Sequence, residues 1–377
     1  MEFSFTDDQE ALRASVREVL EARASARTAM GSKTGTDDAL WRQVCELGWP
    51  GVAVDEQLGG LGLGLIESCI LAEEVGRTVA PIPVFSTLGL AAPAVSAAPE
   101  GPARDAFLRS LAAGEIRATL ALGQRDGRYD AAGVSVKAAA SDGGGWRFSG
   151  KASLVPEAHL ADRIVVLART ASARDKREGL TLFLVDAAAL KRRPKAVDSL
   201  DGTRRLADVS FAGVEVGDDA RLTPVGEAWP VVARALDRSA VLLAAEAVGV
   251  AERALEMAAA YAKEREQFGK KIGSFQAISH RLADMMLAVE NARSHAYYAA
   301  WALEEGTPDA HLAAASAKAA ASDAARIATG GAIQVHGGIG FTWEHDLHLY
   351  YRRAKFCELY LGDASRWRER VASLLAS

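Results

Sequence analysis

Residues 304–338 read EEGTPDAHLAAASAKAAASDAARIATGGAIQVHGG, and this stretch decides the fold class. Alanine is the strongest helix former, and Pro308 suits the start of a helix. Gly330 and Gly331 predict a weak point or a bend in that helix. The same alanine-rich texture, with short loops, begins near Trp229, so we expect an antiparallel helical bundle. Small side chains bury modest apolar area in one bundle, which favours an oligomer.

The middle of the chain, from about Arg117 to Pro224, has a different texture. Short apolar or alternating runs such as GWRFSGKASLV, DRIVVLART and LTLFLVDA are separated by Gly, Asp and Ser, which is typical of strands. The first third reads as helices, beginning with Thr6 as a cap. We therefore expect a mostly α fold with a central β-domain. Its parts are an N-terminal helical domain (1–117), an antiparallel, barrel-like β-domain (118–224) and a C-terminal four-helix bundle (225–377).

The composition is that of an ordinary globular protein. The 377 residues are 49% hydrophobic and 25% charged, with a net charge of -5, which gives no sign of nucleic-acid binding. Three cysteines lack C-x-x-C spacing and read as free thiols in a reducing compartment. The first residues lack the apolar core of a signal peptide, and no apolar run reaches membrane-spanning length. We expect a cytoplasmic protein with no membrane or nucleic-acid partner.

Glu246 is a carboxylate out of place in AVLLAAEAVGVAERAL, residues 240–255. Burying a carboxylate is costly unless it is paired, protonated or used. Three interpretations stay open. Glu246 is a catalytic base, a residue on a solvated face, or a structural acid paired with a basic residue of another helix.

Two further stretches could bind a ligand. In REQFGKKIGSFQAISHRLADM (265–285), Arg265 and Phe268 at a helix end suit a diphosphate and a flat ring, although a solvated basic turn has the same pattern. In QVHGGIGFTWEHDLHLYYRRAKF (334–356), Gly337 and Gly338 allow a ligand close to the backbone. The histidines of this second stretch do not have zinc-site spacing, so we expect no metal.

Together these two motifs resemble those of the acyl-CoA dehydrogenase family, and the resemblance covers nearly the whole chain. It implies FAD bound between subunits of a tetramer. Arg265 and Phe268 are then expected at the diphosphate and adenine end, with Gln276 in the same signature. Gln334, Gly337 and Gly338 are expected to contact FAD from the following loop.

The family reaction is α,β-dehydrogenation of an acyl-CoA thioester. A carboxylate takes the α-proton, the β-hydride goes to flavin N5, and the electrons pass to an electron-transfer flavoprotein. Where the family usually has its glutamate this chain has Leu361, and where a minority of members has it the chain has Ser239.

Glu246 is the first candidate for the missing base. It follows Ser239 by seven residues, which is about 700° of helix, so the two point in the same direction to within roughly 20°. Asp363 is the second candidate. Some actinobacterial-type members, associated with bulky or steroid-derived CoA thioesters, resemble this chain. They have a glutamate at the position of Glu246 and the Gly-Asp pair of Gly362 and Asp363 in the later segment.

The β-domain also departs from the family pattern. Gly123 and Gln124 stand in place of a Thr-Glu motif beside the flavin, and SLVPEAHLAD (153–162) replaces a tryptophan-containing segment. These departures leave two alternatives open. The chain is either a site-sharing or silent subunit of a heterotetramer, or a flavin oxidase or monooxygenase on the same fold.

Overall fold

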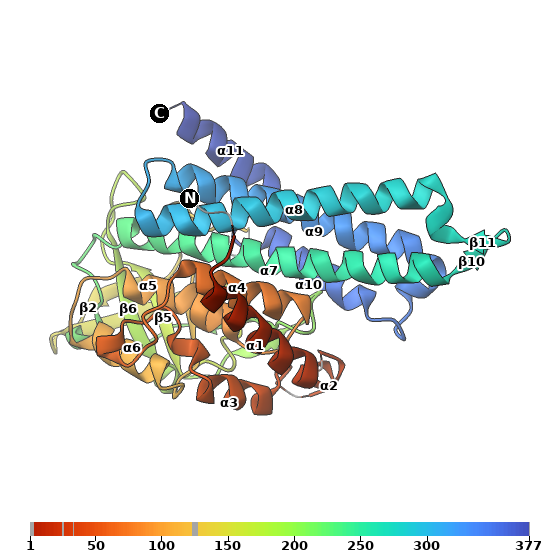
Figure 1. Ribbon diagram of the computed structural model, residues 1–377. Helices are drawn as coiled ribbons and strands as arrows, with labels where there is room; N and C mark the ends of the chain where they lie inside the picture. The colour runs from red at the N-terminus through yellow and green to blue at the C-terminus, as the bar shows by residue number, and fades with distance from the viewer. Residues whose placement is uncertain (1–3, 25, 33, 123–126, 377) are drawn as a thin grey trace.

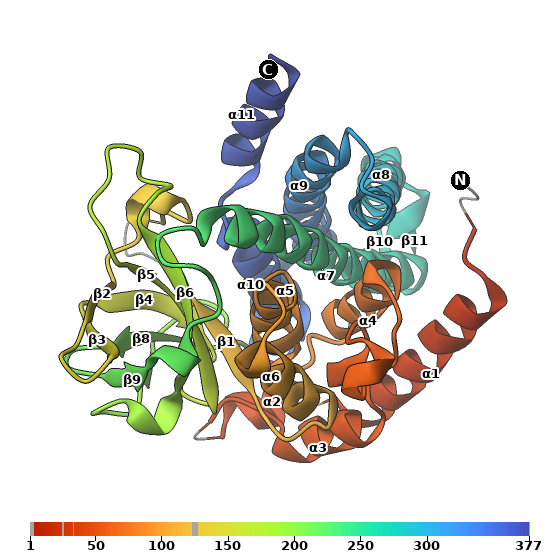
Figure 2. The same cartoon turned by 90° about the vertical axis from the view of Figure 1, so that its left-hand side faces the viewer.

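The computed structural model describes residues 4–24, 26–32, 34–122 and 127–376. Long helices run side by side through the molecule, and the strands gather at one end of them (Figure 1). Seen along the helices, the β-domain lies on one side and the N-terminal helices lie below the bundle (Figure 2). The expected order of helices, strands and helices is confirmed.

The N-terminal part is helical. Thr6 caps the first helix as predicted, because its side chain accepts from the Gln9 amide while Gln9 bonds back to the Thr6 amide. A π-helix, η3 (Phe85–Ala91), runs directly into α5. The helices are α1 (Asp7–Arg23), α2 (Ala26–Met30), α3 (Asp38–Glu46), α4 (Leu65–Arg77), α5 (Ala92–Ser96) and α6 (Pro102–Ala112).

The described residues of the β-domain form two sheets. The larger has the order β1-β5-β2-β3-β9, with β6 on β5, and the smaller is β4-β8-β7. Most pairs are antiparallel, but β5 pairs in parallel with both β1 and β2. The strands are β1 (Ala118–Ala121), β2 (Lys137–Ala140), β3 (Gly145–Ser149), β4 (Lys151–Pro156), β5 (Arg163–Arg169), β6 (Leu180–Asp186), β7 (Lys195–Val197), β8 (Leu206–Ser210) and β9 (Glu215–Gly217).

The C-terminal bundle is built on one long helix, α7 (Trp229–Glu264), which packs against both the N-terminal part and the other bundle helices. A short hairpin, β10 (Glu266–Gln267) and β11 (Lys270–Lys271), leads to the next helix. The remaining helices are α8 (Gln276–Glu305), α9 (Ala310–His336), α10 (Leu347–Leu359) and α11 (Ala364–Leu375). One apolar core runs through the N-terminal helices, β1, β5, β6 and the bundle.

The bend predicted at Gly330 and Gly331 is wrong, because α9 continues unbroken through both. Gly331 serves close packing instead: a Cβ there would lie 2.6 Å from the Met285 sulfur of α8. Elsewhere, the three cysteines are free thiols. No helix in the described part of the chain is long and apolar enough to span a membrane.

Candidate functional site

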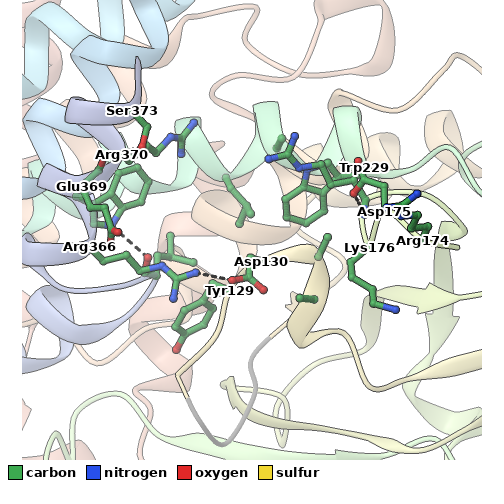
Figure 3. A pocket seen from close by; sticks show the side chains of 17 residues that line it. Tyr129, Asp130, Arg174, Asp175, Lys176, Trp229, Arg366, Glu369, Arg370 and Ser373 are labelled. Carbon is green, nitrogen blue, oxygen red and sulfur yellow. Dashed lines mark hydrogen bonds and ion pairs between the residues drawn. The ribbon is translucent and has the colours of Figure 1, made fainter. Parts of the chain in front are cut away.

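A cavity of about 710 Å³ lies where the β-domain meets the C-terminal bundle, and we call it the junction cavity. It is bordered by residues that follow β1, by the β5–β6 loop, by the start of α7, and by α11 (Figure 3). Its volume falls within the roughly 300–1,000 Å³ range of small-molecule sites. The lining residues are Tyr129, Asp130, Ala131, Ala132, Arg174, Asp175, Lys176, Arg177, Trp229, Ala233, Leu236, Leu361, Arg366, Trp367, Glu369, Arg370 and Ser373.

The wall of the junction cavity has an apolar part and a cationic part. Tyr129, Trp229, Leu236, Leu361 and Trp367 provide the apolar surface. Two of its cations are paired, Arg366 with Asp130 at 2.9 Å and Arg370 with the buried Asp237 at 2.7 Å. The side chains of Arg174, Lys176 and Arg177 make no hydrogen bond or ion pair with other described residues. Three acids, Asp130, Asp175 and Glu369, line the cavity beside its five basic residues, so positive charge is in excess. The cavity therefore suits a molecule with an apolar portion and a negatively charged portion.

Leu361, which stands where the family usually has its glutamate, is on the cavity wall. Its backbone has a φ of 63°, unusual for leucine. The turn is held from two sides, since Trp367 Nε1 donates to the Leu361 carbonyl at 3.1 Å and Lys318 Nζ donates to the Gly362 carbonyl at 3.0 Å. The family's usual position is thus built into the cavity without a carboxylate.

Asp363, the second-choice base, is exposed and caps α11: its Oδ1 accepts from the Arg366 amide at 2.9 Å. It does not belong to the residues that line the junction cavity. The carboxylate is engaged at a helix start, where it stabilises α11.

Glu246 lies inside the molecule, in a buried ion-pair network. Its Oε2 accepts from Arg204 Nη1 at 2.9 Å and its Oε1 accepts from Arg353 Nη1 at 2.7 Å. Arg353 also donates from Nε to Asp201 at 2.6 Å. All four side chains are at most 3% exposed. We call these four residues the buried network. It ties the segment between β7 and β8 to α7 and α10.

This geometry bears on the three interpretations of Glu246. The solvated face is wrong, because Glu246 is 2% exposed. Arg353 is a basic residue of another helix, as the structural alternative expects. Glu246 is not among the described residues that line the junction cavity. Ser239 is on the same helix, and its hydroxyl donates to the Ala235 carbonyl at 2.9 Å. The role of Glu246 as a base stays a prediction, and both of its carboxylate oxygens are engaged by buried guanidinium groups.

Sequence reasoning missed Asp201, Arg204 and Arg353, and Arg204 has the least usual surroundings of the three. Its guanidinium carbon lies 5.0 Å from the centre of the Phe85 ring and 4.8 Å from that of Phe356. Nε and Nη2 have no hydrogen-bond partner among the described residues. Cation–π contacts with the two rings compensate part of the desolvation of these donors.

Near Arg204 a second acid is buried. Glu157 has a φ of 53° and is 4% exposed, and its carboxylate accepts from the Ser86 hydroxyl at 2.5 Å. Burial raises the pKa of the Glu157 carboxyl above its ordinary value. Glu157 belongs to SLVPEAHLAD, one of the two departures at the flavin side. The other, Gly123 and Gln124, lies outside the described residues.

Three of the six predicted FAD contacts come together at the far end of the bundle. Arg265, Phe268 and Gly337 border a surface hollow of about 470 Å³, which Tyr261, His336 and others complete. Phe268 is 92% exposed, with a φ of 54°. Gln276 and Gln334 are also exposed, though neither lines this hollow.

The hollow fits the nucleotide part of FAD. A Cβ at Gly337 or Gly338 would meet nothing within 4 Å, so the loop presents bare backbone to open space. The guanidinium of Arg265 suits a diphosphate, and the ring of Phe268 suits a stacked heterocycle. These are the residues that would hold the nucleotide, with Gln276 and Gln334 at its edge.

The histidines of the second motif lie together without forming a metal site. The ring of His336 stacks on Tyr261 at 4.4 Å, and His345 lies edge-on to His336 at 4.6 Å. Burial lowers the pKa of His336. No group of three or more His, Cys, Asp or Glu in the described part of the chain could hold a metal ion.

Comparison with known proteins assigns the chain to a family. Residues 6–115 match the acyl-CoA dehydrogenase N-terminal domain, and residues 226–375 match the acyl-CoA dehydrogenase C-terminal domain. The acyl-CoA dehydrogenase IpdE2 of Mycobacterium tuberculosis is 36% identical over 88% of this chain and 85% of its own length. The chain belongs to the acyl-CoA dehydrogenase family of FAD-dependent oxidoreductases.

Solved structures have the same fold. Butyryl-CoA dehydrogenase from Megasphaera elsdenii superimposes with a TM-score of 0.92 over both whole chains, at 27% identity. A chain of the ChsE4-ChsE5 complex from Mycobacterium tuberculosis gives 0.89 at 29% identity, covering 100% of this chain and 99% of its own. A chain of the Tcur3481-Tcur3483 steroid acyl-CoA dehydrogenase gives 0.86 at 32% identity, covering 98% of both.

Proposed function

We propose that this protein catalyses FAD-dependent α,β-dehydrogenation of an acyl-CoA thioester bound in the junction cavity. The observation that carries the proposal is the composition of the cavity wall. Arg174, Lys176 and Arg177, whose side chains have no ion-pair partner in the described part of the chain, offer positive charge to the phosphates of CoA. Trp229, Leu236 and Trp367 offer apolar surface to the acyl part. Bound FAD supplies the acceptor for the β-hydride and passes the electrons on to an electron-transfer flavoprotein.

In this proposal Glu246 takes the α-proton. For that, substrate binding must break at least one of its ion pairs, because both carboxylate oxygens accept from buried guanidinium groups and a base needs a free oxygen that reaches the substrate.

A second function is favoured by the absence of a carboxylate at Leu361 and by the two ion pairs that engage Glu246. The chain would be a site-sharing subunit of a heterotetramer, in which a related subunit provides the base. The names of two structural relatives join two different proteins, and one is a steroid acyl-CoA dehydrogenase. A steroid-derived thioester is then the substrate class to test first.

One experiment tests both functions. The protein is purified alone, its oligomeric state and FAD content are measured, and a panel of CoA thioesters from short acyl to steroid-derived is screened for bleaching of the flavin absorbance. One FAD per chain in a homo-oligomer, with bleaching, supports the first function. FAD uptake and bleaching that appear only after co-expression with a related subunit support the second, and absence of both under either condition contradicts the proposal.

The cationic part of the wall can be tested apart from the chemistry. Changing Arg174, Lys176 and Arg177 together to Gln should weaken the binding of free CoA by at least about tenfold, because charge-assisted hydrogen bonds to phosphate are lost. Calorimetric titration measures this directly. Unchanged CoA affinity would place the CoA phosphates elsewhere.

A further inference from the structure

A second cleft lies on the other side of α7 from the junction cavity, and we call it the α7 cleft. At about 100° per residue, Trp229, Ala233 and Leu236 lie on one face of the helix. Arg234 and Arg238 project from the opposite face, into the α7 cleft. The two sites are therefore separated by the thickness of α7.

The α7 cleft has a volume of about 340 Å³ and an apolar interior. Val52, Val54, Leu65, Leu88 and Leu242 are each at most 8% exposed and form its inner surface. Pro50, Ala53, Ser68, Ala92, Pro93, Ser96 and Ala97 complete the wall, and Ala53 and Ser96 are exposed at its mouth. The size is near the lower end of the range of small-molecule sites.

Arg234 and Arg238 are one helical turn apart and provide the cleft's charge. Arg234 is exposed and Arg238 is half-buried. Among the described residues, neither guanidinium makes a hydrogen bond or an ion pair. Arg238 interacts electrostatically with Glu304, and that carboxylate accepts a hydrogen bond from the Leu65 amide at the start of α4. Two cations without partners beside an apolar cleft are complementary to one anionic group on an apolar body.

We propose that the α7 cleft binds a small amphipathic monocarboxylate, with its carboxylate at Arg234 and Arg238 and its hydrocarbon body against Val54, Leu65 and Leu242. Two adjacent guanidinium groups can bind one carboxylate through several N–H donors. The α7 cleft, at about 340 Å³, is too small for CoA together with an acyl group. In the proposed function the larger junction cavity binds the thioester. This inference does not depend on the proposed dehydrogenation.

Methyl NMR with octanoate as the probe tests the site on the intact protein. Titration should give saturable shifts at the methyl groups of Val52, Val54 and Leu242. Octan-1-ol, which has the same chain without the charge, should bind at least about tenfold more weakly. The double variant Arg234→Gln/Arg238→Gln should lose at least about tenfold in octanoate affinity. Arg23→Gln, the same charge change at an exposed arginine of α1 with no described partner, should bind octanoate like the native protein.

Three results would overturn the proposal. The first is a titration without saturable shifts at the cleft methyl groups. The second is a set of shifts confined to Leu236 and Leu361, which would place octanoate in the junction cavity. The third is equal affinity in the native protein and the double variant. None of these results bears on thioester bleaching, so failure of this site and failure of the proposed function are distinguishable.

Discussion

Glu246 has to satisfy two demands at once if it is the base. The buried network uses its charge to neutralise Arg204 and Arg353, and catalysis would need the same oxygens to accept a proton. A pair of buried arginines without their carboxylate is strongly unfavourable, since breaking a buried ion pair costs about 3–5 kcal/mol. Any test of Glu246 must therefore separate folding from chemistry.

The change Glu246→Gln should abolish flavin bleaching by substrate while FAD stays bound, because an amide cannot take the α-proton. It should also lower the free energy of unfolding by about 3 kcal/mol. Stopped-flow bleaching and urea unfolding measure the two effects.

Asp201→Asn is the matched control, because Asp201 pairs with the same Arg353 and is no candidate for the base. It should be destabilised to a similar extent and still bleach. If Glu246→Gln bleached the flavin as fast as the native protein, Glu246 would be a structural acid and not the base. That result would favour the heterotetramer, in which a related subunit provides the base.

Lys318 makes a pH-dependent contribution to stability. It is 1% exposed, donates to the carbonyls of Glu358 and Gly362, and burial lowers its pKa from 10.5 to about 8. Below pH 8 the lysine is charged in both states and the cost of burying that charge is present. Between pH 8 and 10.5 the unfolded state holds the proton that the folded state has lost, so the free energy of unfolding rises with pH.

Replacing Lys318 with Met removes this titration. Relative to the variant, the native protein should gain stability as pH rises from 8 to 10.5, by at most about 3 kcal/mol. Urea unfolding of both proteins across this range provides the comparison. Stability curves that run parallel would contradict a buried, titrating Lys318.

At the scale of elements, α4 and α7 cross with almost no space between them. A Cβ at Gly249 would lie 1.8 Å from the Glu73 carbonyl oxygen, and one at Gly76 would lie 2.1 Å from that of Glu246. The two backbones are in direct contact. This contact fixes the position of the Glu246 backbone relative to α4.

The variant Gly249→Ala should lose at least about 3 kcal/mol of stability, because the clash is with backbone that cannot move aside. Gly330→Ala is its control: it is also inside a helix, but a Cβ there meets nothing within 4 Å. That variant should gain about 0.5–1 kcal/mol. Thermal unfolding measures the change in stability of each variant. The backbone contact at Gly249 would be refuted if both variants were stabilised or both were destabilised.

Elements were predictable where their signal is local. The helix ends around Arg265 and Gln276 follow from the breaker Phe268-Gly269, and the structure has α7 ending at Glu264 and α8 beginning at Gln276. The parallel pairing of β5 was not predictable, because direction and partner depend on distant segments. The bend at Gly330 and Gly331 was wrong for the same reason, since Met285 of another helix decides what Gly331 does.

Some features of the candidate site could also be predicted from the local sequence, and others could not. That Glu246 would be buried and paired or used could be inferred from its apolar neighbours. Its partners could not, because Arg204 is 42 residues away in sequence and Arg353 is 107. The α7 cleft gave no sequence signal at all, since its two arginines resemble any solvated pair on a helix.

For the whole molecule, Phe268 is the clearest sign of assembly. This phenylalanine is 92% exposed, at the tip of a hairpin and with an unfavourable φ of 54°, and its ring lies edge-on to that of Phe275 at 6.2 Å. Aromatic side chains are enriched at protein interfaces, so we expect another surface to cover this ring in the assembled protein. The adjoining hollow, with Arg265 and the open backbone of Gly337, is the expected nucleotide site, so assembly and FAD binding should be coupled.

The variant Phe268→Ser should therefore lose FAD and assembly together, with the fold of each chain intact. Light scattering after size exclusion and the ratio of flavin to protein absorbance measure the two losses, and circular dichroism checks the fold. Met286→Ser, another apolar side chain that is 51% exposed on α8, is the control for removing surface hydrophobicity. If Phe268→Ser kept its native oligomer and full FAD, the hairpin would have no part in either. Loss of FAD from an intact oligomer would restrict Phe268 to the nucleotide, because assembly would then depend on other surfaces.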